Sequence, residues 1–246
     1  MENQRIAVVT GASSGIGEAT ARSLAAAGFT VICAARRTDR IETLAAEIGG
    51  RAVTCDVSSD ESVAELASAV GERCDVLVNN AGGALGLEPV SEADLEKWQA
   101  MYDSNVLGAA RVTKALLPAV EAAQGSIVFV TSVAADGGYE GGAGYCGVKA
   151  AERAIVQSMR LELFDRPVRI CEVVPGMVHT DFSLTRFGGD SARAEKVYAG
   201  VVEPLIAEDL AECIRFIAER PGHVNIDRMV VRPRSQPAQH KIHRIG

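Results

Sequence analysis

Seven short runs of mostly apolar, often β-branched residues recur along the chain, and longer stretches with helical spacing separate them. The runs are nearly continuous in apolar residues, which is typical of strands that are covered on both faces of a sheet. Strands are expected at Ile6–Thr10, Thr30–Ala35, Ala52–Cys55, Val76–Asn79, Ser126–Thr131, Arg169–Val174 and Arg228–Val231. Strands joined through helices become parallel neighbours by right-handed crossovers. The sequence therefore predicts an α/β fold, a doubly wound parallel sheet of about seven strands with helices on both faces.

The stretches between the strands predict the helices and two further segments. Helices are expected at Gly15–Ala27, Arg40–Ile48, Glu61–Gly71, Glu92–Ala123, Ala143–Phe164 and Ala207–Glu219. The alternation is interrupted at Gly188–Val202, where we expect a mobile or helical insertion over the active site, within a substrate loop of about residues 177–203. The polar, basic tail at about 232–246 is expected either to be disordered or to dock on a neighbouring subunit. No linker divides the chain, so residues 1–246 are expected to form a single domain.

Charge and hydropathy exclude several classes of partner. The net charge is −7 with acidic and basic residues interspersed, and the basic stripe of a nucleic-acid binder is missing. The longest apolar stretches, such as Ile6–Val9 and Val76–Val78, are far too short to span a membrane. The opening Met1–Arg5 lacks the pattern of a signal segment. These features predict a cytoplasmic protein that has no nucleic-acid or membrane partner.

The six cysteines show no spacing of a zinc or redox site. Cys33, Cys55 and Cys171 lie within apolar runs that are expected to be strands. We therefore expect buried, reduced thiols and no metal site.

A glycine-rich turn follows the first expected strand. The residues of this turn that we assign to cofactor binding are Gly11, Ser13, Ser14, Gly15, Ile16 and Gly17. Gly11 allows the tight turn, Gly15 lets the backbone approach a pyrophosphate, and Gly17 lets the helix pack closely on the strand. The spacing, Gly-x3-Gly-x-Gly, is wider at its start than the usual pattern, and alone it is also typical of an ordinary strand-to-helix connection. Its place at the first βα junction favours a dinucleotide site in a single-domain, Rossmann-type fold.

The end of the second expected strand indicates which dinucleotide binds. A cofactor that lacks a 2′-phosphate usually meets an acidic residue at this point, but the strand ends in Arg36 and Arg37. Two guanidinium groups there would hold a 2′-phosphate through forked, charge-assisted hydrogen bonds, although a solvated surface pair is the alternative. NADP(H) is therefore the expected cofactor. Asp56, with Val57 beside it, suits a contact with the adenine amino group, and the alternative for Asp56 is a turn residue.

Tyr145 and Lys149 stand four residues apart in an expected helix, so their side chains lie on one helical face. A free tyrosine has a pKa of about 10, and a nearby lysine charge favours the tyrosinate form. Such a pair suits proton transfer near neutral pH, although the spacing alone also occurs in ordinary amphipathic helices.

Two more polar residues are candidates for the same site. Ser132 follows an expected strand at the carboxyl edge, where α/β sheets bind ligands, and its hydroxyl would bond the substrate oxygen. The alternative for this serine is a cap or turn residue. Asn105 lies inside an expected helix, where asparagine is unfavourable. Its amide would hold a water molecule that links Lys149 to solvent, and a local helix kink is an alternative that is compatible with this role.

These motifs, in this order, resemble the short-chain dehydrogenase/reductase family from about Arg5 to Val231. The resemblance is carried by Thr10–Gly17, Asn79–Gly82, Asn105, Ser132, Tyr145-x3-Lys149 and Pro175–Gly176. It implies that Tyr145 is the general acid/base, that Lys149 lowers its pKa and holds the nicotinamide ribose, and that Ser132 orients the substrate. It also implies that Asn105 supports a water relay and that the enzyme is a homotetramer. The further cofactor-binding residues that it implies are Asn79, Ala81 and Gly82 along the groove, and Pro175, Gly176, Val178 and Thr180 beside the nicotinamide.

A closer resemblance concerns the substrate. The segments Leu77–Pro89, Val178–Asp190 and Ala194–Tyr198 are similar to those of the NADP-dependent 3-hydroxy acid dehydrogenases, which act on serine, allo-threonine and related acids or on the corresponding oxo acids and semialdehydes. The forked guanidinium of Arg186 would bind the carboxylate of such a substrate, and the alternatives are a solvated arginine or a pair with Asp190. The competing hypotheses are a reductase of larger neutral aldehydes or ketones, including a 3-oxoacyl carrier-protein reductase, and a non-catalytic NADP-binding sensor.

Overall fold

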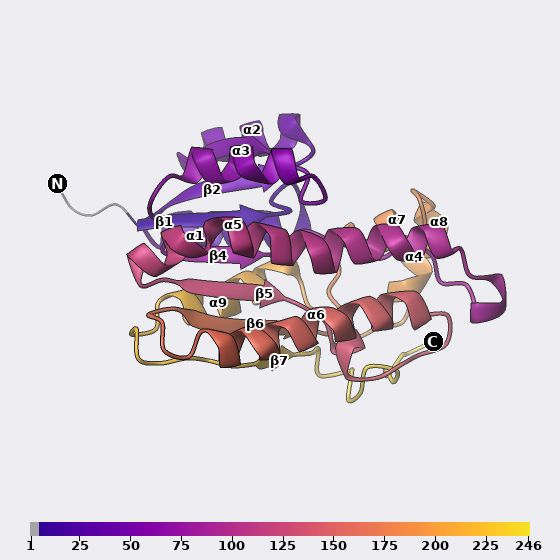
Figure 1. Ribbon diagram of the computed structural model, residues 1–246. Helices are drawn as coiled ribbons and strands as arrows, with labels where there is room; N and C mark the ends of the chain where they lie inside the picture. Colours follow the sequence, from indigo (N-terminus) through magenta and orange to yellow (C-terminus); the bar gives the residue numbers. More distant parts are fainter. Residues whose placement is uncertain (1–4) are drawn as a thin grey trace.

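The computed structural model describes residues 5–246, whose strands form one parallel sheet (Figure 1). The strands are β1 (Arg5–Thr10), β2 (Phe29–Ala35), β3 (Arg51–Thr54), β4 (Val76–Asn79), β5 (Ser126–Val130), β6 (Arg169–Pro175) and β7 (Met229–Val231). Their order in the sheet is β3-β2-β1-β4-β5-β6-β7, and every neighbouring pair is parallel. The doubly wound, seven-stranded sheet that the sequence predicts is therefore confirmed. Residues 1–4, on which part of the signal-segment prediction rests, lie outside the described residues.

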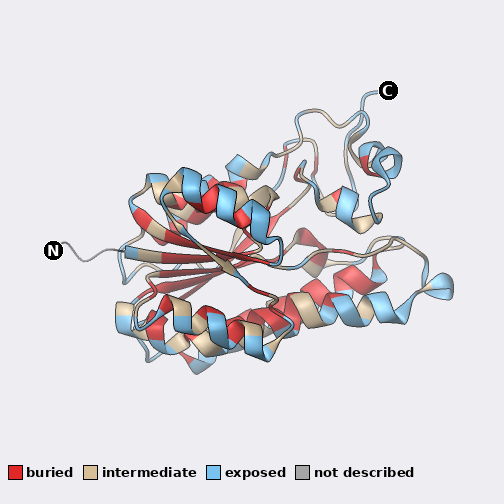
Figure 2. Cartoon of the chain, turned by 90° about the horizontal axis from the view of Figure 1, so that it is seen from above, coloured by how far each residue is buried: buried red, intermediate tan, exposed pale blue. Residues whose placement is uncertain are grey.

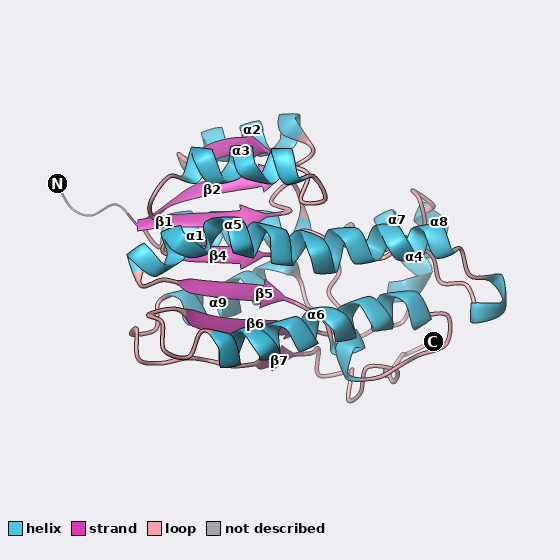
Figure 3. Cartoon of the chain, viewed as in Figure 1, coloured by secondary structure: helices cyan, strands magenta, loops and turns pink. Residues whose placement is uncertain are grey.

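Helices cover both faces of the sheet (Figures 1 and 3). The α-helices are α1 (Gly15–Ala26), α2 (Thr38–Ile48), α3 (Asp60–Val70), α4 (Leu95–Tyr102), α5 (Gly108–Ala123), α6 (Ala143–Glu162), α7 (Phe182–Arg186), α8 (Ser191–Tyr198) and α9 (Ala207–Ala218). One apolar core contains Leu24 of α1 and Ile214 of α9, and the other contains Leu66 of α3 and Leu116 of α5. Figure 2 shows the buried strands between these two helical layers.

Helix α3 shows how local sequence fixes an element. Its expected apolar face, formed by Val63, Leu66 and Val70, is buried. The hydroxyl of Ser59 accepts a hydrogen bond from the backbone N–H of Ser62 at 3.2 Å, and this bond caps the first turn. Gly71 follows the helix with a φ of 79°, a conformation that favours glycine.

The prediction of one continuous helix at Glu92–Ala123 is wrong. Helix α4 runs into a π-helical turn, η2 (Asp103–Leu107), before α5 begins, and a short 3₁₀ turn, η1 (Val90–Glu92), precedes it. Asn105 lies inside the π turn and is fully buried, and its Nδ2 donates a hydrogen bond to the carbonyl of Met101 at 2.8 Å. A side-chain amide that bonds the preceding turn competes with the backbone ladder, and such competition is a known cause of helix irregularity. A local helix irregularity, the alternative interpretation of this asparagine, is thus present in the form of a π turn.

The segment 177–203 and the tail 232–246 pack against each other. The first contains α7 and α8, so the insertion is helical. Gln236 of the tail is only 5% exposed, and its Oε1 accepts a hydrogen bond from the N–H of Met177 at 2.7 Å. An isolated bridge joins Val201 to Arg244. The prediction that the tail is disordered is therefore wrong. The tail packs against other residues of its own chain through buried polar contacts.

The described residues bear on the expectations about cysteines, membrane-spanning segments and metal ligands. Cys33, Cys55 and Cys171 are buried as expected, and each of the chain's cysteines is a free thiol. Between residues 5 and 246, none of the helices combines the length and the hydropathy that crossing a bilayer requires. The same residues contain no group of three or more metal-ligating side chains.

Candidate active site

The candidate site lies at the carboxyl edge of the sheet, beyond the ends of β1, β4, β5 and β6. The strand arrows in Figure 3 all point toward this edge, which carries α7 and α8. The strand order reverses at β1, since β2 lies on one side of it and β4 on the other. Ligands bind open α/β sheets in the crevice at such a switch point. A third apolar cluster, which includes Met101, Tyr145 and Val148, builds the wall of the site.

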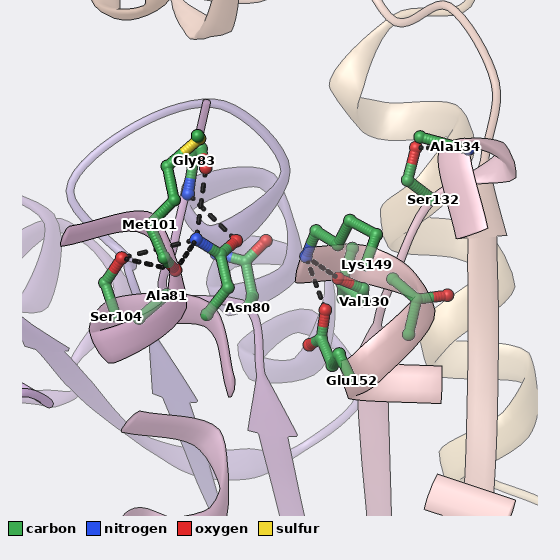
Figure 4. Close-up of polar contacts among 12 residues, drawn as sticks. Asn80, Ala81, Gly83, Met101, Ser104, Val130, Ser132, Ala134, Lys149 and Glu152 are labelled. Carbon is green, nitrogen blue, oxygen red and sulfur yellow. Dashed lines mark hydrogen bonds and ion pairs between the residues drawn. The ribbon is translucent and has the colours of Figure 1, made fainter. Parts of the chain in front are cut away.

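Helix α6 carries Tyr145 and Lys149, and both are nearly buried, at 8% and 6% exposure. The Nζ of Lys149 lies 6.0 Å from the centroid of the Tyr145 ring, so the structure brings the two groups together as expected. The ring of Tyr145 also meets Phe182 edge to face, with 5.6 Å between centroids. Lys149 donates hydrogen bonds to the carbonyl of Val130 at 3.2 Å and to the carboxylate of Glu152 at 2.7 Å (Figure 4).

Ser132 follows β5, and Asn105 lies in the π turn η2 between α4 and α5. Ser132 precedes the 3₁₀ turn η3 (Val133–Asp136) and caps it, since its Oγ accepts a hydrogen bond from the N–H of Ala134 at 3.1 Å (Figure 4). The cap therefore exists, and it also fixes where the hydroxyl lies. Asn105 exchanges two hydrogen bonds with the backbone of Gly83, both at 3.1 Å. It packs so closely on the neighbouring glycine that a Cβ on Gly82 would collide with its Oδ1.

The glycine-rich turn has the geometry of a phosphate cradle. Gly11 and Gly15 have φ angles of 67° and 55°, which residues with side chains rarely adopt. A Cβ on Gly17 would collide with the carbonyl oxygen of Gly11, so α1 starts directly against the turn. Ile16 packs against the core below it. The free N–H groups at the start of α1 and the close backbone packing fit a dinucleotide pyrophosphate.

The two arginines after β2 lie beside this turn. Arg37 donates hydrogen bonds to the hydroxyls of Ser13, at 2.8 and 3.0 Å, and of Ser14, at 2.6 Å. Burial lowers the pKa of Arg37, and the neighbouring charge of Arg40 lowers it further. Arg36 is exposed next to it. The two serine hydroxyls can donate hydrogen bonds to a phosphate group. The neighbouring arginines can form charge-assisted hydrogen bonds with the same group.

A cleft of about 370 Å³ opens between this turn and the loop after β6. Gly15 and Thr180 are among its lining residues, and a Cβ on Gly15 would lie 3.4 Å from the Cβ of Thr180. An ion pair of 3.7 Å joins Arg40 of α2 to Asp181 across the cleft. The sequence predicted Thr180 but not this pair, because its two members are far apart in the chain.

Several other predicted cofactor residues have defined places. Asp56 accepts hydrogen bonds from the N–H and the hydroxyl of Ser58, and the bond from this hydroxyl, ahead of other causes, lowers the pKa of Asp56. Asp56 thus has the local bonds of a turn residue, and its contact with the adenine remains a prediction. Val57 packs against α5, since a Cβ on Gly108 would lie 2.7 Å from it.

In the Asn79–Gly82 segment, the two asparagines have different surroundings. The amide of Asn79 is buried and donates to the hydroxyl of Thr113 at 2.8 Å. The next residue, Asn80, contacts the glycine-rich turn, since its Nδ2 donates to the carbonyl of Thr10 at 2.9 Å. The N–H of Ala81 also bonds Thr10, at its Oγ1. Asn80 was not predicted from the sequence as a site residue, although Asn79 of the same motif was.

The loop after β6 carries the residues expected beside the nicotinamide. Pro175 ends β6, and the N–H of Gly176 bonds the carbonyl of Val231 at 2.7 Å. Val178 is buried and forms a bridge with Leu205. Gln236 lies against this loop, since a Cβ on Gly176 would collide with its Oε1.

Arg186, at the end of α7, points into the site. Its Nε donates to the carbonyl of Gly86 at 2.9 Å, and its Nη2 donates to the hydroxyl of Tyr139 at 2.9 Å. The guanidinium carbon lies 5.5 Å from the centroid of the Tyr145 ring. No acidic side chain of residues 5–246 pairs with it, and Asp190 instead caps α8. Of the alternatives, the pair with Asp190 is therefore absent from the described chain.

Comparisons with known proteins agree with this geometry. A profile of the short chain dehydrogenase family matches residues 5–188. An uncharacterized oxidoreductase of Mycobacterium tuberculosis is 58% identical over 234 residues, which are 95% of this chain and 92% of that protein. An NADP-dependent 3-hydroxy acid dehydrogenase of Escherichia coli is 39% identical over 238 residues, with 94% and 96% of the two chains covered.

A solved structure, the closed form of a serine dehydrogenase complexed with NADP+, superimposes with a TM-score of 0.91 at 35% identity. The superposition covers 98% of this chain and all of that one (100%). The family match spans most of the chain, and the identities extend over nearly all of it. The chain belongs to the short-chain dehydrogenase/reductase family.

Proposed function

We propose that the protein is an NADP(H)-dependent oxidoreductase that interconverts small 3-hydroxy acids and the corresponding oxo acids or semialdehydes, with Tyr145 as the proton-transfer residue. The observation that carries the substrate class is the Arg186 guanidinium, held over the Tyr145 ring by Gly86 and Tyr139. Its forked donors suit a carboxylate beside the reacting carbon. The relatives that are named for serine and for 3-hydroxy acids support the same class.

In this proposal the chain's own residues bind, orient and move one proton. Bound NADP(H) supplies or accepts the hydride. Tyr145 exchanges a proton with the substrate oxygen. The ammonium of Lys149 lies 6.0 Å from the centroid of its ring, and an opposite charge nearby favours the phenolate that forms in this exchange. Ser132 donates to or accepts from the same oxygen. Asn105 supports a water relay behind Lys149.

The residues that would hold NADP(H) surround the glycine-rich turn and the loop after β6. Those of the turn and of the strand ends near it are Gly11, Ser13, Ser14, Gly15, Ile16, Gly17, Arg36, Arg37, Asp56, Val57, Asn79, Ala81 and Gly82. Those nearer the reaction centre are Tyr145, Lys149, Pro175, Gly176, Val178 and Thr180. The preference for the 2′-phosphate is assigned to the Arg36–Arg37 pair.

Replacement of Arg37 by glutamine is expected to weaken NADP+ binding by about 10- to 100-fold, because a charge-assisted hydrogen bond contributes about 1.5–3 kcal/mol. Binding of NAD+ should change little, since it carries no 2′-phosphate. Arg37→Lys keeps the charge but loses the fork, so an intermediate loss is expected. Titration calorimetry with both dinucleotides measures the effect. An equal loss for both would remove Arg37 from 2′-phosphate recognition.

The function itself is tested by initial rates with NADP(H) and NAD(H) on serine, allo-threonine, 3-hydroxypropionate and a panel of neutral aldehydes. NADP-linked turnover of the hydroxy acids supports the proposal. Turnover confined to neutral carbonyls would keep the proton-transfer residue and discard the substrate class.

We also propose a cytoplasmic homotetramer. Leu161, in the last turn of α6, and Phe164, just after this helix, are 78% and 84% exposed. Neighbouring large apolar side chains that are this exposed often belong to an interaction surface. Burial between subunits would remove this apolar surface from solvent. Light scattering coupled to size-exclusion chromatography measures the mass, and a concentration-independent monomer would contradict the assembly.

A further inference from the structure

Two glutamates are buried close to Lys149. Glu152, on α6, is 3% exposed, and Glu172, on β6, is 0% exposed. Acidic side chains are rarely buried so fully unless a partner compensates their charge. The family motif explains Tyr145 and Lys149, but neither glutamate belongs to it.

Glu152 holds the ammonium of Lys149 directly. Its Oε2 lies 2.7 Å from the Nζ, and the side chains of the pair are only 4% and 7% exposed (Figure 4). The three-residue spacing places both groups on one face of α6. The carbonyl of Val130, at 3.2 Å, is a second acceptor for the same ammonium. These two acceptors fix where the charge lies relative to the Tyr145 ring.

Glu172 is compensated separately. Its Oε1 accepts a hydrogen bond from the hydroxyl of Thr131 at 2.7 Å. Its Oε2 lies 3.4 Å from the Nε of Arg228. Because Arg228 provides the cation for Glu172, Lys149 is left as the cation for Glu152.

Charges in this region are balanced. Farther out, Asp136 pairs with both Arg153 and Arg228. The cations of the network are Lys149, Arg153 and Arg228, and its anions are Asp136, Glu152 and Glu172. Each cation of this network thus has a carboxylate counterpart. Arg186 lies outside the network and 5.5 Å from the centroid of the Tyr145 ring, so neutralising Glu152 would add a second uncompensated positive charge next to Tyr145.

The pKa directions agree with an ionised lysine in this setting. Burial alone lowers the pKa of Lys149, but the carboxylate of Glu152, followed by Tyr145 and Glu172, raises it above its ordinary value. Burial raises the pKa of Glu152, Lys149 opposes this rise, and the charge of Glu172 adds to it.

We propose that Glu152 is a positioning residue of the active site: its carboxylate fixes the Lys149 ammonium and offsets part of the positive charge that this ammonium presents to Tyr145. The inference rests on the proposed role of Tyr145. In this proposal Glu152 acts through Lys149, the cation that its carboxylate contacts. Lys149 and, from α7, Arg186 are the cations that face the Tyr145 ring, and Glu152 offsets the charge of the first.

The test is Glu152→Gln, read first without substrate or cofactor. Tyrosinate absorbance is titrated in the wild type and in the variant, and the Tyr145 signal is isolated by subtracting the same titration of Tyr145→Phe in each background. With the compensating charge removed, the Tyr145 pKa is expected to fall by about one unit, the lower end of the effect of a nearby charge. The pH profile of alcohol oxidation should move the same way, since oxidation needs the tyrosinate. An unchanged or higher Tyr145 pKa would overturn the proposal.

Two further variants separate this effect from a structural one. Glu162→Gln removes the same charge from an exposed position of the same helix and should leave the titration unchanged. Glu152→Asp keeps the charge but shortens the side chain, so the Tyr145 pKa should stay near that of the wild type while kcat falls. It also provides the comparison if the glutamine variant does not fold. Since the absorbance titration needs no substrate, a wrong substrate class would leave this result intact.

Discussion

Tyr145→Phe is expected to lower kcat in both directions by at least about 10²- to 10⁴-fold, the usual contribution of a positioned acid or base. The change deletes one hydroxyl and keeps the ring that packs edge to face on Phe182. The fold and the dinucleotide affinity should therefore be retained. Steady-state rates with NADP(H) measure the loss, and calorimetry measures cofactor binding. A residual rate within about tenfold of the wild type would remove Tyr145 from proton transfer.

A loss in Tyr145→Phe is informative only if the rest of the site is intact. Thermal unfolding of the variant provides this control, because Tyr145 is 8% exposed and its removal from the apolar cluster would lower the melting temperature. We expect little change in melting temperature, since the ring remains.

Arg186→Met is expected to lower kcat/KM for 3-hydroxy acids by about 10²-fold or more, since each charge-assisted hydrogen bond to a carboxylate contributes about 1.5–3 kcal/mol. Methionine keeps much of the apolar stem and removes the guanidinium, whose carbon lies 6.0 Å from the centroid of the Phe182 ring. Neutral aldehydes lack the carboxylate, so their kcat/KM should change by less than about threefold if the site geometry is retained. Initial rates with both substrate groups provide the measurement.

Arg186 also holds the loop at Gly86 and the hydroxyl of Tyr139, so loop damage must be separated from the loss of a carboxylate ligand. The neutral aldehydes serve as this control, because a displaced loop would lower turnover of every substrate. Tyr139→Phe provides a second control, since it removes one bond to Arg186 but leaves the guanidinium. An equal loss for acids and neutral aldehydes would contradict the carboxylate role.

Strand positions could be read from the sequence because strands covered on both faces are continuous in apolar residues. All seven expected strands are present within a residue or two of their expected bounds, as β1 at Arg5–Thr10 and β7 at Met229–Val231 show. The break in the helix expected at Glu92–Ala123 could not be located in this way. The amide of Asn105 bonds the Met101 carbonyl within the helix and is also held by the backbone of Gly83, a residue that is distant in sequence.

The same reason explains what was missed in the site. Glu152 stands three residues after Lys149, a spacing that is also typical of a solvated surface pair. Its burial depends on the surrounding elements, which the helix alone does not reveal. Gln236 supports the loop at Met177 from 59 positions away along the chain. The family motif placed Tyr145 and Lys149 because their spacing is local to one helix.

The π turn at Asp103–Leu107 changes the angular phase between α4 and α5. An α-helix advances by about 100° per residue. One extra residue in the π turn therefore rotates the side chains of α4 by about that angle relative to the side chains of α5. Met101 of α4 is buried in the cluster around Tyr145, whereas Val112 and Leu116 of α5 are buried in the core against the sheet. The length of the turn thus sets which side of α4 meets the site, independently of how α5 is seated. Substitutions on α4 can therefore reshape the entrance to the site while α5 keeps its place on the sheet.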